Sequence, residues 1–295
     1  MLHRLRRLAR WPALAAMGLI ILLVSSDGLQ LNPAQRAVAP FLYDIVGWHA
    51  GNFLDKWVHL ALEVLPWNST SDEDQLARVR EYFELGEEST RIGSELDRLH
   101  ALADADTVTT RTLEAELAGS ASRRAALRAD VEERIESMIS SVAADEGLGL
   151  FRDVVFPPVD VRLTGTPDLL VTSPRDRIWR SHEALLESGV PVADRERIEK
   201  TLLDGSNLSA LVLDLGGVAT YPASVPDGRP LLATLQLSAH EWIHHYLFFR
   251  ALGQNMFDDG DMQSLNETVA DLAGREMGDR VFETLGGVPA AGLSA

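Results

Sequence analysis

The sequence contains no cysteine. This absence excludes disulfide bonds, thiolate zinc sites, iron–sulfur clusters and a cysteine nucleophile. Basic residues are also few, since 27 Lys and Arg stand against 44 Asp and Glu, and the formal net charge is −17 over 295 residues. Such acidity argues against a nucleic-acid partner, because phosphate contacts need a basic face. With 46% hydrophobic and 24% charged residues, the composition is that of a folded globular protein.

The N-terminus departs from this acidic composition. Residues 1–26 contain four arginines and no acidic residue, and residues 11–24 form an apolar run, WPALAAMGLIILLV. A basic start followed by an apolar run is typical of a secretory signal peptide or an N-terminal membrane anchor. Arginine-rich flanks stay on the cytoplasmic side, so both alternatives place residues 27–295 outside the cytoplasm. We therefore expect a single-pass protein of the cell membrane, or a secreted one if the segment is cleaved.

The next two regions are predicted to be helical. Residues 27–70 carry apolar side chains at roughly helical spacing and three of the six tryptophans. These juxtamembrane amphipathic helices either lie at the outer membrane interface, which tryptophan favours, or pack as a helix pair on the main domain. Residues 71–146 show two apolar stripes separated by a break near 103–108, with Ser71 as a helix cap. This pattern predicts a coiled-coil-like helical hairpin.

Residues 147–295 alternate short apolar strands with helices, which predicts an α+β domain. Strands are expected at 159–163, 169–172, 208–215 and 218–223, and helices at 174–188, 193–203, 230–252 and 265–282. Pro222 confines the strand at 218–223 to an edge or a strand end. His182 and Glu183 would be a surface pair on the helix that begins after Ser173.

The helix expected at 230–252 contains His240-Glu241-Trp242-Ile243-His244, an HExxH motif. Residues four apart share one helix face, so both imidazoles can reach one ion. Glu241 would lie beside that ion, where a carboxylate can take a proton from bound water. The pentapeptide alone is a modest signal, and two surface histidines on a helix are the simpler interpretation.

A second segment, Asn266-Glu267-Thr268-Val269-Ala270-Asp271, strengthens the metal interpretation. A zinc site with two histidines needs one more protein ligand, and Glu267 follows His244 by enough chain for a loop and a returning helix. Asp271, one turn later, can accept the remaining N–H of a ligand histidine. The competing explanation is a capping box, in which Ser264 caps the helix and Glu267 is its third residue.

Together, these two motifs resemble those of thermolysin-like gluzincin zinc metallopeptidases, in particular the small membrane-attached bacterial type. The resemblance covers about thirty residues. It implies a zincin-like catalytic domain, with a small mixed sheet, an HExxH helix and a helix that carries the glutamate ligand. It also implies zinc held by His240, His244 and Glu267, Glu241 as general base and Asp271 in support of a histidine. Cobalt or manganese could occupy the same ligands. The expected substrate is a peptide or protein.

One feature of these enzymes is missing. They stabilise the oxyanion with a His or Tyr that follows the glutamate ligand, but no His or Tyr follows Glu267 in this chain. Tyr221, on the predicted edge strand, is the first candidate for this catalytic role, although it could equally be a packed aromatic. The alternative function is a catalytically inactive, membrane-tethered zincin-fold binding or scaffold protein.

Two smaller features remain. Asp258, Asp259 and Asp261 form an acidic loop, which is either solvated or a calcium site, although EF-hand spacing is absent. Asn68-Ser69-Thr70 has the form of a glycosylation acceptor, which has meaning only in a glycosylating host.

Overall fold

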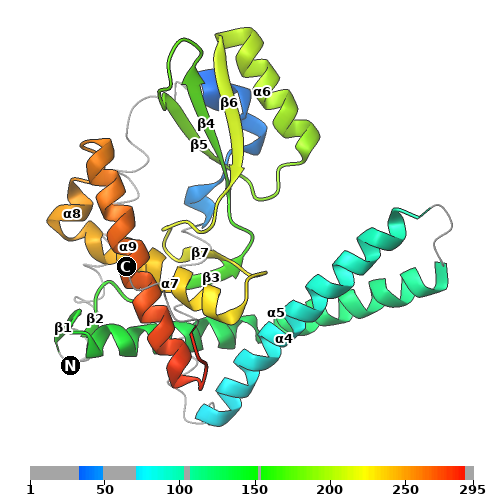
Figure 1. Cartoon of the computed structure of the whole chain (residues 1–295), viewed down its shortest axis with the longest axis vertical. Helices are drawn as coiled ribbons and strands as arrows, with labels where there is room; N and C mark the ends of the chain where they lie inside the picture. The colour runs from blue at the N-terminus through cyan, green and yellow to red at the C-terminus, as the bar shows by residue number, and fades with distance from the viewer. Residues whose placement is uncertain (1–32, 49–70, 103–106, 152–153, 290–295) are drawn as a thin grey trace, which may run out of the picture. The chain divides into compact units, whose positions relative to one another are not determined.

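The structure, a computed structural model, describes residues 33–48, 71–102, 107–151 and 154–289 (Figure 1). Its helices are α2 (Pro33–Ala37), η1 (Ala39–Phe41), α4 (Asp72–His100), α5 (Thr107–Asp145), α6 (Val192–Ser206), α7 (Leu231–Phe248), α8 (Ala251–Gln254) and α9 (Gly260–Thr284). Its strands are β1 (Gly149–Phe151), β2 (Val154–Val155), β3 (Val161–Thr164), β4 (Asp168–Pro174), β5 (His182–Leu186), β6 (Leu208–Asp214) and β7 (Ala223–Pro226). The expected α+β class, with long helices and small sheets, is confirmed.

The predicted N-terminal segment, residues 1–26, lies outside the described residues, as does most of the region 27–70. Among the helices that the structure describes, none combines the length and apolar character needed to cross a bilayer. Contacts divide the chain into two compact units. Of the described residues, the first unit contains 33–42, 170–184 and 192–211, and the second contains the others.

The first unit holds α2, α6 and most of a three-stranded sheet with the order β5-β4-β6. The helix predicted for residues 174–188 is wrong, because this stretch contains the end of β4 and the whole of β5. Burial along β4 alternates with a period of two, and Ala184 and Leu186 are the buried residues of β5. The Ser173-Pro174 pair therefore ends a strand instead of capping a helix, and His182 and Glu183 lie on a strand.

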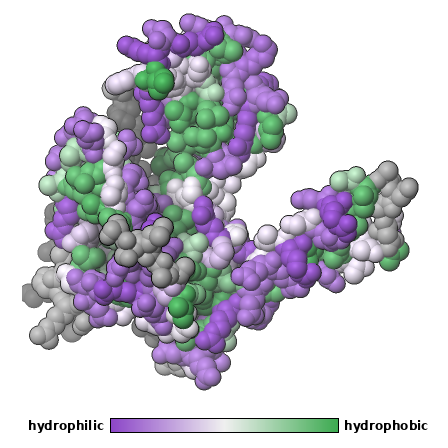
Figure 2. All heavy atoms as spheres, in the orientation of Figure 1, coloured by the Kyte–Doolittle hydropathy of each residue, from purple (hydrophilic) through white to green (hydrophobic). Residues whose placement is uncertain are grey.

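The second unit contains the two helices predicted between residues 71 and 144. Helix α4 begins after Ser71, whose hydroxyl oxygen accepts the N–H of Asp74 at 3.2 Å. The apolar stripes of α4 and α5 face each other, and the two helices run side by side (Figure 1). Their outer surface carries mostly hydrophilic residues on the face seen in Figure 2. On that surface Arg123 donates to both carboxylate oxygens of Glu81, at 2.6 and 2.9 Å.

Helix α5 also closes one edge of a small parallel sheet formed by β3 and β7. The buried carboxylate of Glu132 accepts the N–H of Leu163 at 2.7 Å, and Glu136 accepts the N–H of Val161 at 2.9 Å. Strand edges expose backbone donors that must find partners when they are buried. The helical hairpin of α4 and α5 also shares a hydrophobic core with α7 and α9, and that core includes the fully buried Trp242.

The strand predicted at 218–223 is largely wrong, since β7 begins only at Ala223. Before it, Val218 forms a single antiparallel bridge with Ser224, through two backbone hydrogen bonds of 3.0 Å. Thr220 then turns the chain by donating from its backbone N–H to Val218 and from its hydroxyl to Pro222. Proline has no N–H for a sheet ladder, so regular pairing starts after Pro222, in agreement with its predicted place at a strand end.

Candidate metal centre

Helices α7 and α9 are antiparallel and pack closely through two glycines. A Cβ on Gly274 would lie 2.7 Å from the Cα of His240, and one on Gly278 would lie 2.5 Å from the Cα of Gln236. Real side chains do not approach a backbone so closely, so these two positions require glycine. Because Gly274 and Gly278 are four residues apart, they form one stripe on α9 and bring its backbone directly against the histidine-bearing turn of α7.

Helix α9 begins earlier than the sequence predicts, and this changes the interpretation of Glu267. Asp259 is the N-cap, and its carboxylate accepts the N–H of Met262 at 2.8 Å. Ser264 lies inside the helix and donates its hydroxyl to the carbonyl of Gly260 at 2.8 Å. The capping-box explanation is therefore wrong. Glu267 lies in the second turn of α9, where its side chain is available for other contacts, and Asp259 has a structural role as a cap.

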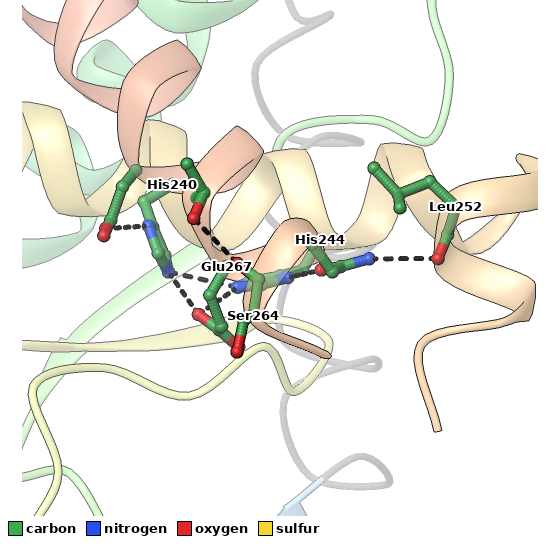
Figure 3. Close-up of polar contacts among 8 residues, drawn as sticks. His240, His244, Leu252, Ser264 and Glu267 are labelled. Atoms are coloured by element: carbon green, nitrogen blue, oxygen red, sulfur yellow. Dashed lines mark hydrogen bonds and ion pairs between the residues drawn. The ribbon is translucent and has the colours of Figure 1, made fainter. Parts of the chain in front are cut away.

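His240, His244 and Glu267 point toward one another across the interface of α7 and α9 (Figure 3). The two Nε2 atoms are 3.0 Å apart, and Glu267 Oε2 is 3.7 Å from Nε2 of His240 and 3.4 Å from Nε2 of His244. Ligand atoms at about 2.0–2.1 Å from a tetrahedral ion lie about 3.4 Å from one another. The three atoms are thus spaced like three corners of such a tetrahedron, and the group could bind a metal ion.

The other ring nitrogens of the two histidines have acceptors as partners. His240 Nδ1 is 3.0 Å from a carboxylate oxygen of Asp271, as the sequence predicts. His244 Nδ1 is 2.9 Å from Oδ1 of Asn266, whose amide nitrogen donates to the carbonyl of Leu252 at 3.4 Å and so fixes the direction of the amide. In the neutral form of each ring, the hydrogen is therefore on Nδ1, and the lone pairs of the two Nε2 atoms then face each other.

With both rings neutral, this arrangement favours a cation between them, since two lone pairs and a carboxylate oxygen converge on one place. The role of Asn266, which is 1% exposed, was missed at the level of sequence. The signal that could have found it is its position directly before Glu267. If Glu267 reaches the histidines of α7, a polar neighbour in the same helical turn can also reach one of them.

The charges of the cluster suit a metal ligand set near neutral pH. Burial and the nearby His244 lower the pKa of His240, which keeps this ring neutral. A hydrogen bond from His244 and the charges of both histidines lower the pKa of Glu267 in spite of partial burial, which keeps it ionised. Burial acts to lower the pKa of His244, but the hydrogen bond and charge of Glu267 outweigh it and raise that pKa. A metal ion would compete with this last proton.

Glu241 lies next to the cluster and is 4% exposed. Burial is the main cause that raises its pKa to about 8; the charge of His244 opposes this effect and that of Glu267 adds to it. The carboxylate lies against Gly217, where a side chain would collide with it. Both residues line a pocket of about 400 Å³ together with His240 and Asp271. The predicted base thus lies at the wall of this pocket, beside the group formed by His240, His244 and Glu267.

Tyr221 is not brought into this cluster. Its hydroxyl donates to the carbonyl of Pro158 at 3.4 Å, and its ring packs edge-on against His245 with a centroid distance of 5.4 Å. Burial and the charge of Asp160 raise the pKa of its hydroxyl. His245, one position after His244 on α7, faces Tyr221 and not the other two residues of the candidate metal site, His240 and Glu267. The contacts of Tyr221 are those of a packed aromatic residue.

Among the residues that the structure describes, His240, His244 and Glu267 form the one group suited to hold a metal ion, and it does not include the acidic loop at 258–261. No protein-family model, no curated protein and no solved structure matches the chain. An assignment of function therefore depends on the geometry and chemistry of this group.

Proposed function

We propose that this chain is a zinc metallopeptidase of the gluzincin type, with a zincin-like arrangement in its second unit. The observation that carries the proposal is the convergence of His240 Nε2, His244 Nε2 and Glu267 Oε2 at tetrahedral spacing, beside the buried carboxylate of Glu241. Two histidines, one carboxylate and an open position form one of the ligand sets of catalytic zinc sites. Structural zinc sites, in contrast, use four protein ligands.

A zinc ion held by His240, His244 and Glu267 would supply a Lewis acid for the scissile carbonyl and would lower the pKa of a bound water. Glu241 accepts a proton from the attacking water and passes it to the leaving nitrogen. Its raised pKa, about 8 before an ion is bound, suits a group that must both take and release a proton near neutral pH. Asp271 and Asn266 hold the two rings in the tautomer that leaves each Nε2 free for the metal.

The segment around Val218 would hold an extended peptide substrate. Val218 uses both its N–H and its C=O in the bridge with Ser224. In an extended strand, the backbone groups of alternate residues point in opposite directions, so those of Gly217 and Ala219 face away from Ser224. Gly217 lies directly against Glu241. A peptide that pairs with this edge by strand addition would pass over the general base.

We also propose that residues 1–26 attach the chain to the cell membrane, with residues 27–295 outside the cytoplasm; if the segment is cleaved, the chain is secreted. The support is the run of four arginines followed by the apolar stretch 11–24. Membrane fractions of cells that express the full chain should retain it after carbonate extraction, and a variant that lacks residues 1–26 should be soluble. Recovery of the full chain from the cytosol would contradict this location.

Metal content and hydrolysis test the function together. We expect about one zinc ion per chain by elemental analysis, and loss of this zinc in His240→Ala, His244→Ala and Glu267→Ala. His182→Ala, which removes a histidine from β5, is the matched control and should keep its zinc. Glu241→Gln should also keep the zinc but lower the rate of peptide hydrolysis by at least about 100-fold.

The outcomes separate the proposal from its alternative. A wild-type chain that binds no stoichiometric zinc would refute the metal centre. Hydrolysis by Glu241→Gln at the wild-type rate would refute the general base and leave the metal centre intact. A zinc-loaded chain that cleaves no peptide of a broad library would favour the inactive binding or scaffold protein.

A further inference from the structure

Two arginines stand in the wall of the pocket that contains His240 and Glu241. Arg229 precedes the cap of α7, and Arg275 is on α9. Both side chains belong to exposed residues. Within the described residues neither guanidinium forms an ion pair or a hydrogen bond. The chain as a whole is acidic, with a net charge of −17, so two unpaired positive charges in one pocket are unusual for this protein.

The position of Arg275 follows from the repeat of α9. Glu267, Asp271 and Arg275 follow one another at intervals of four residues and therefore lie on one side of the helix at successive turns. Asp271 is an (i, i+4) neighbour of Arg275, and such pairs commonly form ion pairs on helices. Here the carboxylate of Asp271 is instead 3.0 Å from His240 Nδ1. The positive charge of Arg275 thus remains available to a ligand in the pocket.

Arg229 lines the pocket from the segment between β7 and α7. One of its guanidinium nitrogens lies 3.6 Å from the place that a Cβ on Gly216 would occupy. Gly216 precedes Gly217, which lies against the carboxylate of Glu241. The guanidinium of Arg229 is therefore close to the strand segment that would hold a peptide, and Arg275 faces the same pocket from α9.

We propose that Arg229 and Arg275 together bind a carboxylate of the substrate, three to four residues from the bond that is cut. This inference rests on the proposed peptidase function and adds a substrate class to it. A guanidinium matches a carboxylate with two parallel hydrogen bonds, which makes arginine well suited to this group. Glu267 and Arg275 are eight residues apart, about 12 Å along the helix axis. An extended peptide covers this distance in three to four residues.

A carboxylate at this distance has two sources, the free C-terminus of a short peptide and the side chain of an acidic residue. Three peptides separate them: tetra-alanine with a free C-terminus, its C-terminal amide, and the same amide with one alanine replaced by glutamate. Binding is measured by calorimetry on the zinc-loaded Glu241→Gln protein, so the readout does not depend on turnover.

We expect at least one carboxylate peptide to bind about tenfold more tightly than the neutral amide, a preference that weakens as salt is added. Arg275→Gln and Arg229→Gln, each added to Glu241→Gln, should remove most of this preference with zinc content unchanged. Arg275→Lys should keep part of it, because the charge stays and the two-pronged hydrogen bond is lost. Arg80→Gln, at an exposed position of α4, is the control and should change nothing.

Three results would overturn the inference: equal affinity for the carboxylate peptides and the amide, no binding of any of the three, or a preference that survives both arginine substitutions. Hydrolysis assays on the wild-type chain distinguish a failure of the anion site from a failure of the proposed peptidase function. Cleavage without a carboxylate preference would refute the anion site alone. A carboxylate preference without any cleavage would refute the peptidase function and leave the anion site standing.

Discussion

Replacement of Glu241 by glutamine should stabilise the metal-free protein, and the gain should grow with pH. Burial raises the pKa of Glu241 from 4.5 to about 8 in the folded chain. An acid whose pKa is raised by folding contributes its full stability below the unfolded value, and that contribution is lost as pH rises toward the folded value. From these two pKa values, folding is weakened by about 1 kcal/mol at pH 5 and about 3 kcal/mol at pH 7. A neutral glutamine is free of this loss.

Urea denaturation of chelator-treated protein at pH 5, 6 and 7 measures the effect. The difference in unfolding free energy between Glu241→Gln and the wild type should grow by about 2.5 kcal/mol from pH 5 to pH 7. Other titrating groups are common to both proteins and largely cancel in this difference. Glu84→Gln, at an exposed glutamate of α4, serves as the matched control and should show little change with pH. If the difference in unfolding free energy between Glu241→Gln and the wild type does not change with pH, burial does not raise the pKa of Glu241, and the reasoning is refuted.

Two further predictions concern the helix that carries Glu267. In thermal melts, Gly274→Ala should lower the stability of the chain by about 1–3 kcal/mol, because its methyl group would push α9 away from His240; it should also weaken zinc binding. The control is Gly93→Ala, in open space on α4, which should instead raise the stability by up to about 1 kcal/mol. In urea unfolding, Asp259→Ala should lower the free energy of unfolding by about 1 kcal/mol through loss of the helix cap, whereas Ser264→Ala should lower it by less than about 0.5 kcal/mol. The reverse order would support Ser264 as the cap of a capping box.

The predictions from sequence were most accurate where one local pattern determines the outcome. The amphipathic stripes of α4 and α5 and the cap at Ser71 are local features, and the two helices are present. The four-residue spacing of His240 and His244 puts both rings on one face of α7 by helix geometry alone. The same spacing puts Asp271 one turn after Glu267, and the packing of α9 against α7 then brings it to the ring of His240.

The errors arose where tertiary partners override local signals. Ser173-Pro174 resembles a helix start, but Ser181 donates its N–H to Thr172 at 2.8 Å, and this pairing draws the following residues into β5. Ser264 resembles a cap, but the carboxylate of Asp259 satisfies the N–H groups at the true start of α9. Local propensity is a weak prior that tertiary contacts can reverse.

The meeting of the two motifs depends on residues that carry no chemistry. Gly274 and Gly278 form one stripe of α9. By helix geometry Glu267 lies on that same face, nearer the start of the helix, and Asp271 and Arg275 lie progressively further round. The glycine stripe fixes the separation of α7 and α9, because a methyl group at either position would collide with backbone. With that separation fixed, Glu267, Asp271 and Arg275 can place a candidate metal ligand, a partner for a histidine and a cation at successive turns. Because the close approach of the helices depends on the two glycines and not on these three side chains, substitutions of Glu267, Asp271 or Arg275 should change binding while the helix pair remains folded. Substitutions of either glycine should change both.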